Sequence, residues 1–128
     1  MTLDEILEID AQRNHEPGTV AGHLRAIINQ QIREHRGHLV QQGDTLIVFS
    51  NSDGDDDVEF HCFNADTPPN LAANVVKFFE MAKKLGYKTA TTPYDNPKVS
   101  ELFKQFLPKK YKLEIKKKKG QFEAKVSL

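Results

Sequence analysis

Hydrophobic residues along this chain recur at helical spacing in some segments and at every second position in others. Leu3, Ile6 and Leu7 share one face of a helix, and a longer helical pattern follows the break at 15–18. From His38 onward the period falls to two, which is typical of strands. The patterns predict helices at 3–14 and 20–37, strands at 38–40, 46–49 and 58–63, a helix at 67–85, a strand at 87–92, a helix at 96–107, and strands at 111–115 and 122–128.

The residues at the predicted boundaries support these elements. Thr2 and Glu5 have the spacing of a capping box, in which each side chain bonds the backbone N–H of the other residue. The pair Pro68–Pro69 opens the third helix, where a missing N–H removes no intrahelical bond, and Gly86 ends it. Asn96 is suited to cap the fourth helix.

The order of predicted elements, ααβββαβαββ, favours one α/β domain of the α+β kind over residues 1–128. We expect a mixed, mostly antiparallel central sheet with helices flanking it. The uninterrupted apolar run Leu46–Phe49 predicts a strand buried in the middle of that sheet.

The element order resembles the GNAT superfamily of acyl-CoA N-acyltransferases over nearly the whole chain. Asn96, Val99, Leu102 and Phe103 stand in the register of that family's fourth helix, which often reads Asn, a small residue three on, and then Leu-Tyr. The resemblance implies the GNAT fold, with a cofactor cleft flanked by the third and fourth helices.

The chain departs from the family's pattern at two places. Phe103 stands where the family often has a tyrosine that protonates the departing thiolate, and a phenyl ring has no proton to give. Before the third helix the family has a glycine-rich loop that holds the pyrophosphate of acyl-CoA. Here the segment 65–70 contains the pair Pro68–Pro69, which lacks two N–H donors, and Asp66, which adds a negative charge. These departures favour a protein without a cofactor.

The net charge of zero conceals two halves of opposite sign. Residues 1–70 carry 13 acidic and 4 basic side chains, whereas residues 71–128 carry 5 acidic side chains and 14 lysines. The densest run of lysines is a candidate surface for a protein partner or for nucleic acid, bound without sequence specificity since arginine is absent there. It consists of Lys116, Lys117, Lys118 and Lys119.

Few other residues suggest chemistry. Glu59 and His61 share one face of a predicted strand and form a candidate acid–base pair. The acidic segment 53–57 lacks the alternation and distal glutamate of a calcium loop, so a solvated loop is favoured. Cys62 alternates with core residues and is expected to be a small buried hydrophobe. No metal site is predicted, because the histidines lack ligand spacing.

Three functions follow. The favoured one is a non-catalytic GNAT-like structural or interaction protein without a cofactor, resembling accessory or virion proteins of tailed phages. The first alternative is an active acetyl-CoA-dependent N-acetyltransferase with an atypical cofactor loop, in which Glu59 or His61 is the base and Asn96 lies near the cofactor. The second is a lysine-driven nucleic-acid binding module.

The chain shows no apolar run of membrane-spanning length and no basic, apolar start typical of a signal peptide. Its single cysteine fits a reducing compartment. We therefore expect a cytoplasmic protein, in the host cytoplasm or the virion if a phage encodes it, with a protein partner or self-association and no membrane contact.

Overall fold

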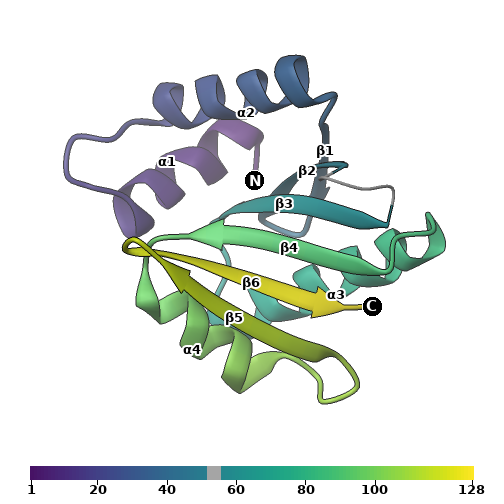
Figure 1. Cartoon of the computed structure of the whole chain (residues 1–128). Helices are drawn as coiled ribbons and strands as arrows, with labels where there is room; N and C mark the ends of the chain where they lie inside the picture. Colours follow the sequence, from purple (N-terminus) through teal and green to yellow (C-terminus); the bar gives the residue numbers. More distant parts are fainter. Residues whose placement is uncertain (52–55) are drawn as a thin grey trace.

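A six-stranded sheet lies between two pairs of helices (Figure 1). The computed structural model describes residues 1–51 and 56–128. The elements are α1 (Leu3–Asn14), α2 (Ala21–His35), β1 (His38–Gln42), β2 (Thr45–Asn51), β3 (Asp57–Asn64), α3 (Pro68–Lys84), β4 (Thr89–Tyr94), α4 (Pro97–Phe106), β5 (Lys112–Lys118) and β6 (Gln121–Ser127). Their order confirms the ααβββαβαββ prediction.

The sheet has the strand order β1-β2-β3-β4-β6-β5. All neighbouring strands are antiparallel except β3 and β4, which run parallel because α3 connects them across one face. The sheet is therefore mixed and mostly antiparallel, as predicted. The lysine-rich strand β5 lies at one edge (Figure 1).

Helices α1 and α2 pack on one face of the sheet. Their core includes Ile6, Leu7, Leu24 and Ile28, packed against Leu46 and neighbouring strand residues. The predicted apolar face of α2 is only partly buried, because some of its residues are exposed to solvent. Val20 is 55% exposed, Ile27 46% and Ile32 36%.

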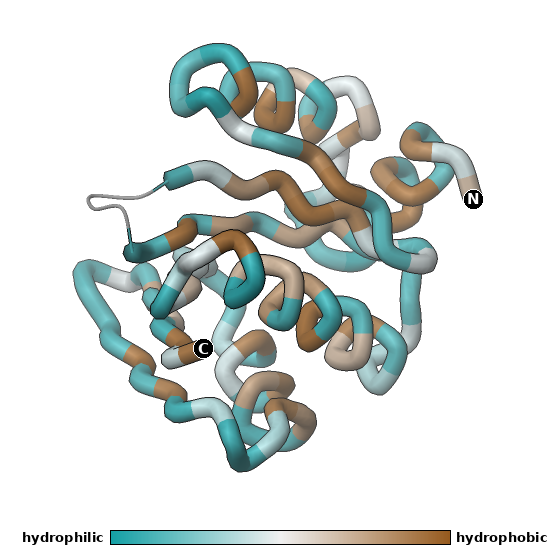
Figure 2. The backbone as a smooth tube through the Cα atoms, turned by 90° about the vertical axis from the view of Figure 1, so that its right-hand side faces the viewer, coloured by the Kyte–Doolittle hydropathy of each residue, from teal (hydrophilic) through white to brown (hydrophobic). Residues whose placement is uncertain are grey.

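Helices α3 and α4 cover the opposite face. Phe78 and Phe79 of α3 are fully buried against Phe60 and Val58 of β3 and Ile47 of β2. Figure 2 shows the resulting concentration of apolar residues along the central strands. Alternate residues of β2 and β3 pack into the cores on opposite faces of the sheet. A one-residue shift in the register of either strand would therefore move its side chains to the wrong face.

The predicted boundary residues act as expected. Thr2 and Glu5 form both hydrogen bonds of the capping box. The Asn96 side chain accepts a hydrogen bond from the Lys98 N–H at 3.0 Å. Gly86 follows α3 with φ +100°, a conformation that side-chain-bearing residues rarely adopt. The fourth strand begins two residues later than predicted, because the Lys88 and Thr89 N–H groups both bond the Asp56 carbonyl.

The predicted acidic loop at 53–57 falls largely outside the described residues, since Asp53, Gly54 and Asp55 are not among them. Within the described ranges, no group of three His, Cys, Asp or Glu side chains is placed to hold a metal ion. Nor does any helix in these ranges have the length and apolar character needed to cross a membrane.

Candidate functional site

The two parallel strands β3 and β4 pair over a short stretch and then separate. The paired residues are Asp57 with Thr89, Val58 with Ala90, and Glu59 with Thr91. Beyond Glu59, β3 continues to Asn64 without a β4 partner in the described structure, while β4 stays paired to β6. The β4-facing backbone N–H and C=O groups of residues 60–63 are thus free of the sheet ladder and available to an extended ligand, whereas the Asn64 N–H donates a hydrogen bond to Asp10.

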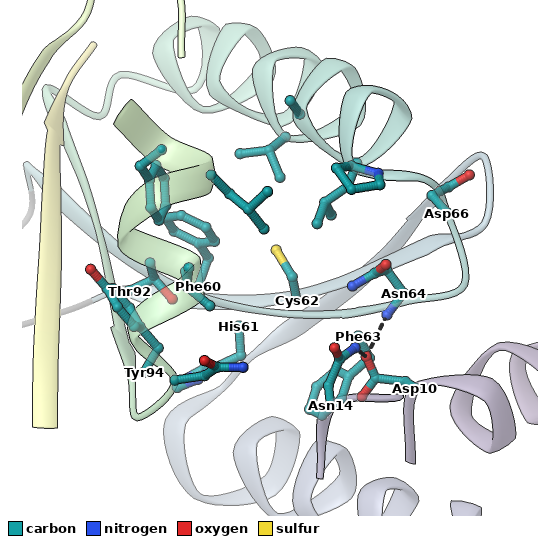
Figure 3. Close-up of a pocket in the computed structure, with 18 of the residues that line it drawn as sticks. Asp10, Asn14, Phe60, His61, Cys62, Phe63, Asn64, Asp66, Thr92 and Tyr94 are labelled. Carbon is teal, nitrogen blue, oxygen red and sulfur yellow. Dashed lines mark hydrogen bonds between the residues drawn. The ribbon is translucent and has the colours of Figure 1, made fainter. Parts of the chain in front are cut away.

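The separation opens a cavity of about 550 Å³ between the strands. Figure 3 shows Cys62 near its centre, with the sulfur pointing into the space. Asp10, Asn14 and Asn64 lie on one side of it, and Thr92 and Tyr94 on the other. Since residues from both helical layers line the cavity, the opening reaches both faces of the sheet.

The wall formed by α3 and α4 is mainly apolar. Its residues come from the first half of α3 and the inward face of α4. They are Leu71, Ala72, Val75, Val76, Val99, Leu102 and Phe103. This wall suits an extended ligand with an apolar carbon chain. Polar groups along the same ligand can bond the free backbone of β3.

The wall formed by α1 is polar and centred on a buried carboxylate. Asp10 is 2% exposed. Its Oδ1 accepts hydrogen bonds from Asn14 Nδ2 at 2.8 Å and from the Asn64 backbone N–H at 2.9 Å. Its Oδ2 lies 2.7 Å from Nε2 of His15, which also lines the cavity. These contacts join the end of α1 to the end of β3.

Of the predicted acid–base pair, only His61 lines the cavity. Its Nε2 lies 3.6 Å from Glu59 Oε2, beyond hydrogen-bond distance, and this nitrogen is buried without a hydrogen-bond partner in the described structure. Burial lowers the pKa of His61 below its ordinary value, and the Glu59 carboxylate only partly opposes that effect. His61 is therefore a neutral imidazole at neutral pH. Asn96, the third predicted residue, lines the cavity from the start of α4.

The Asp66 carboxylate, in the segment before α3, does not face a ligand as the sequence suggested. Its Oδ2 accepts hydrogen bonds from the Asp44 N–H at 3.1 Å, the Thr45 hydroxyl at 2.7 Å and the Asn74 amide at 2.9 Å. Figure 3 shows the Asp66 side chain pointing away from the cavity. Its charge is compensated within the fold and is not directed at a ligand. Instead, the Arg13 guanidinium reaches this segment and donates to the Asp66 carbonyl oxygen at 3.1 Å.

We expect Asp66→Ala to lower the free energy of unfolding by about 2–4 kcal/mol, because three donors lose their acceptor and the Asn74 amide is buried. Urea unfolding measures the change. Asp95→Ala is the control, since Asp95 is exposed and should change stability by less than about 0.5 kcal/mol. An Asp66→Ala protein as stable as the control would show that this carboxylate has no structural role.

Cys62 is not an activated nucleophile. Burial, with a smaller effect from the Asp10 carboxylate, raises the pKa of its thiol to about 12. The thiol is protonated at neutral pH, whereas nucleophilic cysteines react as thiolates. The prediction of a small apolar side chain fits this environment, although Cys62 lines the cavity and is only partly buried.

The lysine run lies apart from the cavity. Lys116, Lys117 and Lys118 belong to the exposed edge strand β5, and Lys119 forms the following turn. None of the four lines the cavity.

No protein-family model and no curated protein sequence matches the chain. Its fold does match solved structures. One is an acetyltransferase from Bacillus subtilis in complex with CoA, with a TM-score of 0.63 and 15% identity, over 100% of this chain and 94% of that chain. A second is a putative acetyltransferase from Salmonella typhimurium with acetyl-CoA, with a TM-score of 0.53 and 11% identity, over 98% and 85%. A third is the GNAT domain of S. lividans PAT, with a TM-score of 0.53 and 13% identity, over 72% and 60%.

The chain has the GNAT fold. This confirms the resemblance seen in the sequence, while the comparisons give no support to a phage or virion origin. The solved structures also contradict the prediction of a non-catalytic protein without a cofactor, because they are acetyltransferases and two contain CoA or acetyl-CoA. Part of the basis for that prediction was the Asp66 charge, which was taken to face the ligand but accepts a hydrogen bond from the Thr45 hydroxyl within the fold.

Most of the polar wall of the cavity was not predicted from the sequence. Asp10 and His15 were not paired as candidates, and Arg13 was not considered. The only local signal for Asp10 was an acidic residue on the apolar side of α1, beside Ile6 and Leu7, where an unpaired charge is unfavourable.

Proposed function

We propose that this protein is an acetyl-CoA-dependent N-acetyltransferase that transfers an acetyl group to an amine in the cavity between β3 and β4. The separation of the two strands carries the proposal. It provides free backbone groups, an apolar wall and openings toward both faces in one place. The CoA-containing acetyltransferases that share the fold support the choice of acyl donor.

The residues of the cavity fit the chemical parts of acetyl-CoA. The free backbone of residues 60–63 can bond the amide groups of the pantetheine arm, and the apolar side chains of α3 and α4 can cover its carbon chain. Arg13 places a guanidinium beside the start of α3, where two prolines have removed N–H donors. We propose that Arg13 compensates for that loss with a charged contact to the phosphates.

We propose His61 as the base, because it lines the cavity as a neutral imidazole with a buried, unpartnered Nε2. Glu59 acts on it only as a nearby charge, and Asn96 lies near the donor. His61 takes one proton from the ammonium form of the acceptor, and the freed lone pair attacks the thioester carbonyl carbon. The C–N bond forms and the C–S bond breaks with its electron pair on sulfur. A second amine proton ends on that sulfur, and His61 returns its proton to water.

The decisive measurement is acetyl-CoA binding by calorimetry. Ala72 lines the cavity and Ala73 of the same helix is exposed, so tryptophan at these two positions forms a matched pair. We expect the wild type and Ala73→Trp to bind acetyl-CoA, and Ala72→Trp to bind at least about tenfold more weakly because the indole occupies the cavity. No binding by the wild type would refute the proposed function.

The lysine run on β5 remains a separate proposal for a protein partner or for nucleic acid. Support comes from its exposure at a sheet edge and from the +9 charge of residues 71–128. A pull-down with the wild type and with Lys116→Glu plus Lys118→Glu tests for a protein partner. Salt-dependent binding of arbitrary duplex DNA tests for nucleic acid.

A further inference from the structure

The cavity contains a second carboxylate–histidine pair, Asp10 and His15, which the proposed transfer step does not use. The two residues lie five positions apart, at the end of α1 and just beyond it. The Asp10 carboxylate is buried, whereas the His15 side chain is 33% exposed. His15 is therefore the part of the pair that a ligand can reach.

The contacts of Asp10 fix the hydrogen-bonding character of His15. Both Asp10 oxygens already accept hydrogen bonds, so the carboxylate has little capacity to bind a ligand directly. An ionised carboxylate only accepts hydrogen bonds, so in the neutral ring Nε2 carries the proton and Nδ1 has a lone pair. Within the described structure no other hydrogen bond involves the His15 ring. Nδ1 of this tautomer is thus an acceptor whose ring is held in place by the carboxylate behind it.

The position of His15 suits an acceptor molecule. The apolar wall, the free β3 backbone and Arg13 are assigned to acetyl-CoA, which leaves the rest of the polar α1 wall for the second substrate. An ammonium group has N–H donors and no acceptor, so it complements the lone pair of Nδ1. With the Asp66 side chain turned away, the residues that line the cavity supply two carboxylates, those of Asp10 and Asp95, against one guanidinium, that of Arg13. The surrounding charge of residues 1–70, with 13 acidic and 4 basic side chains, also favours a cation.

We infer that the Asp10–His15 pair binds the acceptor amine, and that the preferred acceptor is a primary amine carrying a net positive charge. The inference rests on the proposed acetyltransferase function. His15 accepts a hydrogen bond from the ammonium group through Nδ1 and holds the nitrogen in the cavity that His61 also lines. It binds and positions the acceptor, and His61 remains the group that removes the proton.

Calorimetry on the full chain saturated with CoA tests the inference with three probe amines of decreasing charge: spermidine, glycinamide and glycine. We expect spermidine to bind most tightly and glycine most weakly. His15→Ala should weaken spermidine binding by about 10- to 100-fold, as expected for a lost hydrogen bond to a charged group. The same variant should leave acetyl-CoA affinity unchanged, because His15 is not among the groups assigned to the donor. His23→Ala is the matched control, since His23 lies in the first turn of α2 and outside the cavity.

The outcomes separate the two proposals. If spermidine affinity is the same in His15→Ala and His23→Ala, or if glycine binds as tightly as spermidine, the acceptor assignment is wrong. If acetyl-CoA binds but none of the probes does at millimolar concentration, the assignment is likewise wrong while the donor site stands. Failure of the wild type to bind acetyl-CoA refutes the proposed function itself. Asp10→Asn adds a check, because it keeps the side-chain size and should weaken spermidine binding by removing the charge behind His15.

Discussion

His61→Ala is expected to lower kcat for acetyl transfer by about 100- to 10,000-fold, the range that general-base catalysis contributes. The affinity for acetyl-CoA should stay the same, because the backbone of β3 and the apolar wall do not depend on this imidazole. Release of CoA with spermidine as acceptor measures the rate. Glu59→Gln is the comparison, since Glu59 neither lines the cavity nor forms a hydrogen bond to His61.

The pH dependence of the transfer rate is a second test of His61 as the base. The base acts in its neutral form, and burial lowers the pKa of His61 below 6.5. The rate should therefore be level above pH 6.5 and fall as the pH drops through the lowered pKa. Glu59 raises the pKa of His61 and the nearby His35 lowers it. Glu59→Gln should accordingly move the acid limb to lower pH. A limb that stays in place, or a His61→Ala variant with wild-type kcat, would exclude His61 as the base.

Phe78→Ala is expected to cause the largest loss of stability, about 3–5 kcal/mol in the free energy of unfolding. The Phe78 ring is fully buried, and its centroid lies 5.3 Å from those of Phe49 and Phe60 and 6.1 Å from that of Phe79. Truncation leaves a hole between α3 and the sheet that these rings fill only in part. The same packing holds α3 in place as one wall of the cavity, so acetyl-CoA binding should weaken as well.

Urea unfolding checks this value through a lower midpoint at an unchanged slope. Leu85→Ala, at the exposed end of the same helix, is the control and should change stability by less than about 0.5 kcal/mol, because Leu85 is 62% exposed. A loss below about 1 kcal/mol for Phe78→Ala would mean that the four rings do not form one packed cluster.

The position of Asp66 shows why the functional prediction from the sequence was wrong. The sequence places a carboxylate and two prolines where the GNAT family has a glycine-rich loop. It does not show that Thr45 and Asn74, 21 residues before Asp66 and 8 after it, turn the carboxylate away from the cavity. Hydrogen bonds between distant segments decide where a charge points, and residue spacing carries no information about them.

The amino-acid sequence alone determined the order and type of the elements, the capped helix ends and the two faces of β3, because these depend on local periodicity and on side chains bonding the adjacent backbone. Only the tertiary structure decided that β3 and β4 part after Glu59 and that Asp10 meets Asn64 across 54 positions of chain. The cavity exists because β3 and β4 pair at one end and separate at the other, while each stays paired to its outer neighbour, β2 or β6. That geometry depends on the twist and packing of the whole sheet, which no local pattern records.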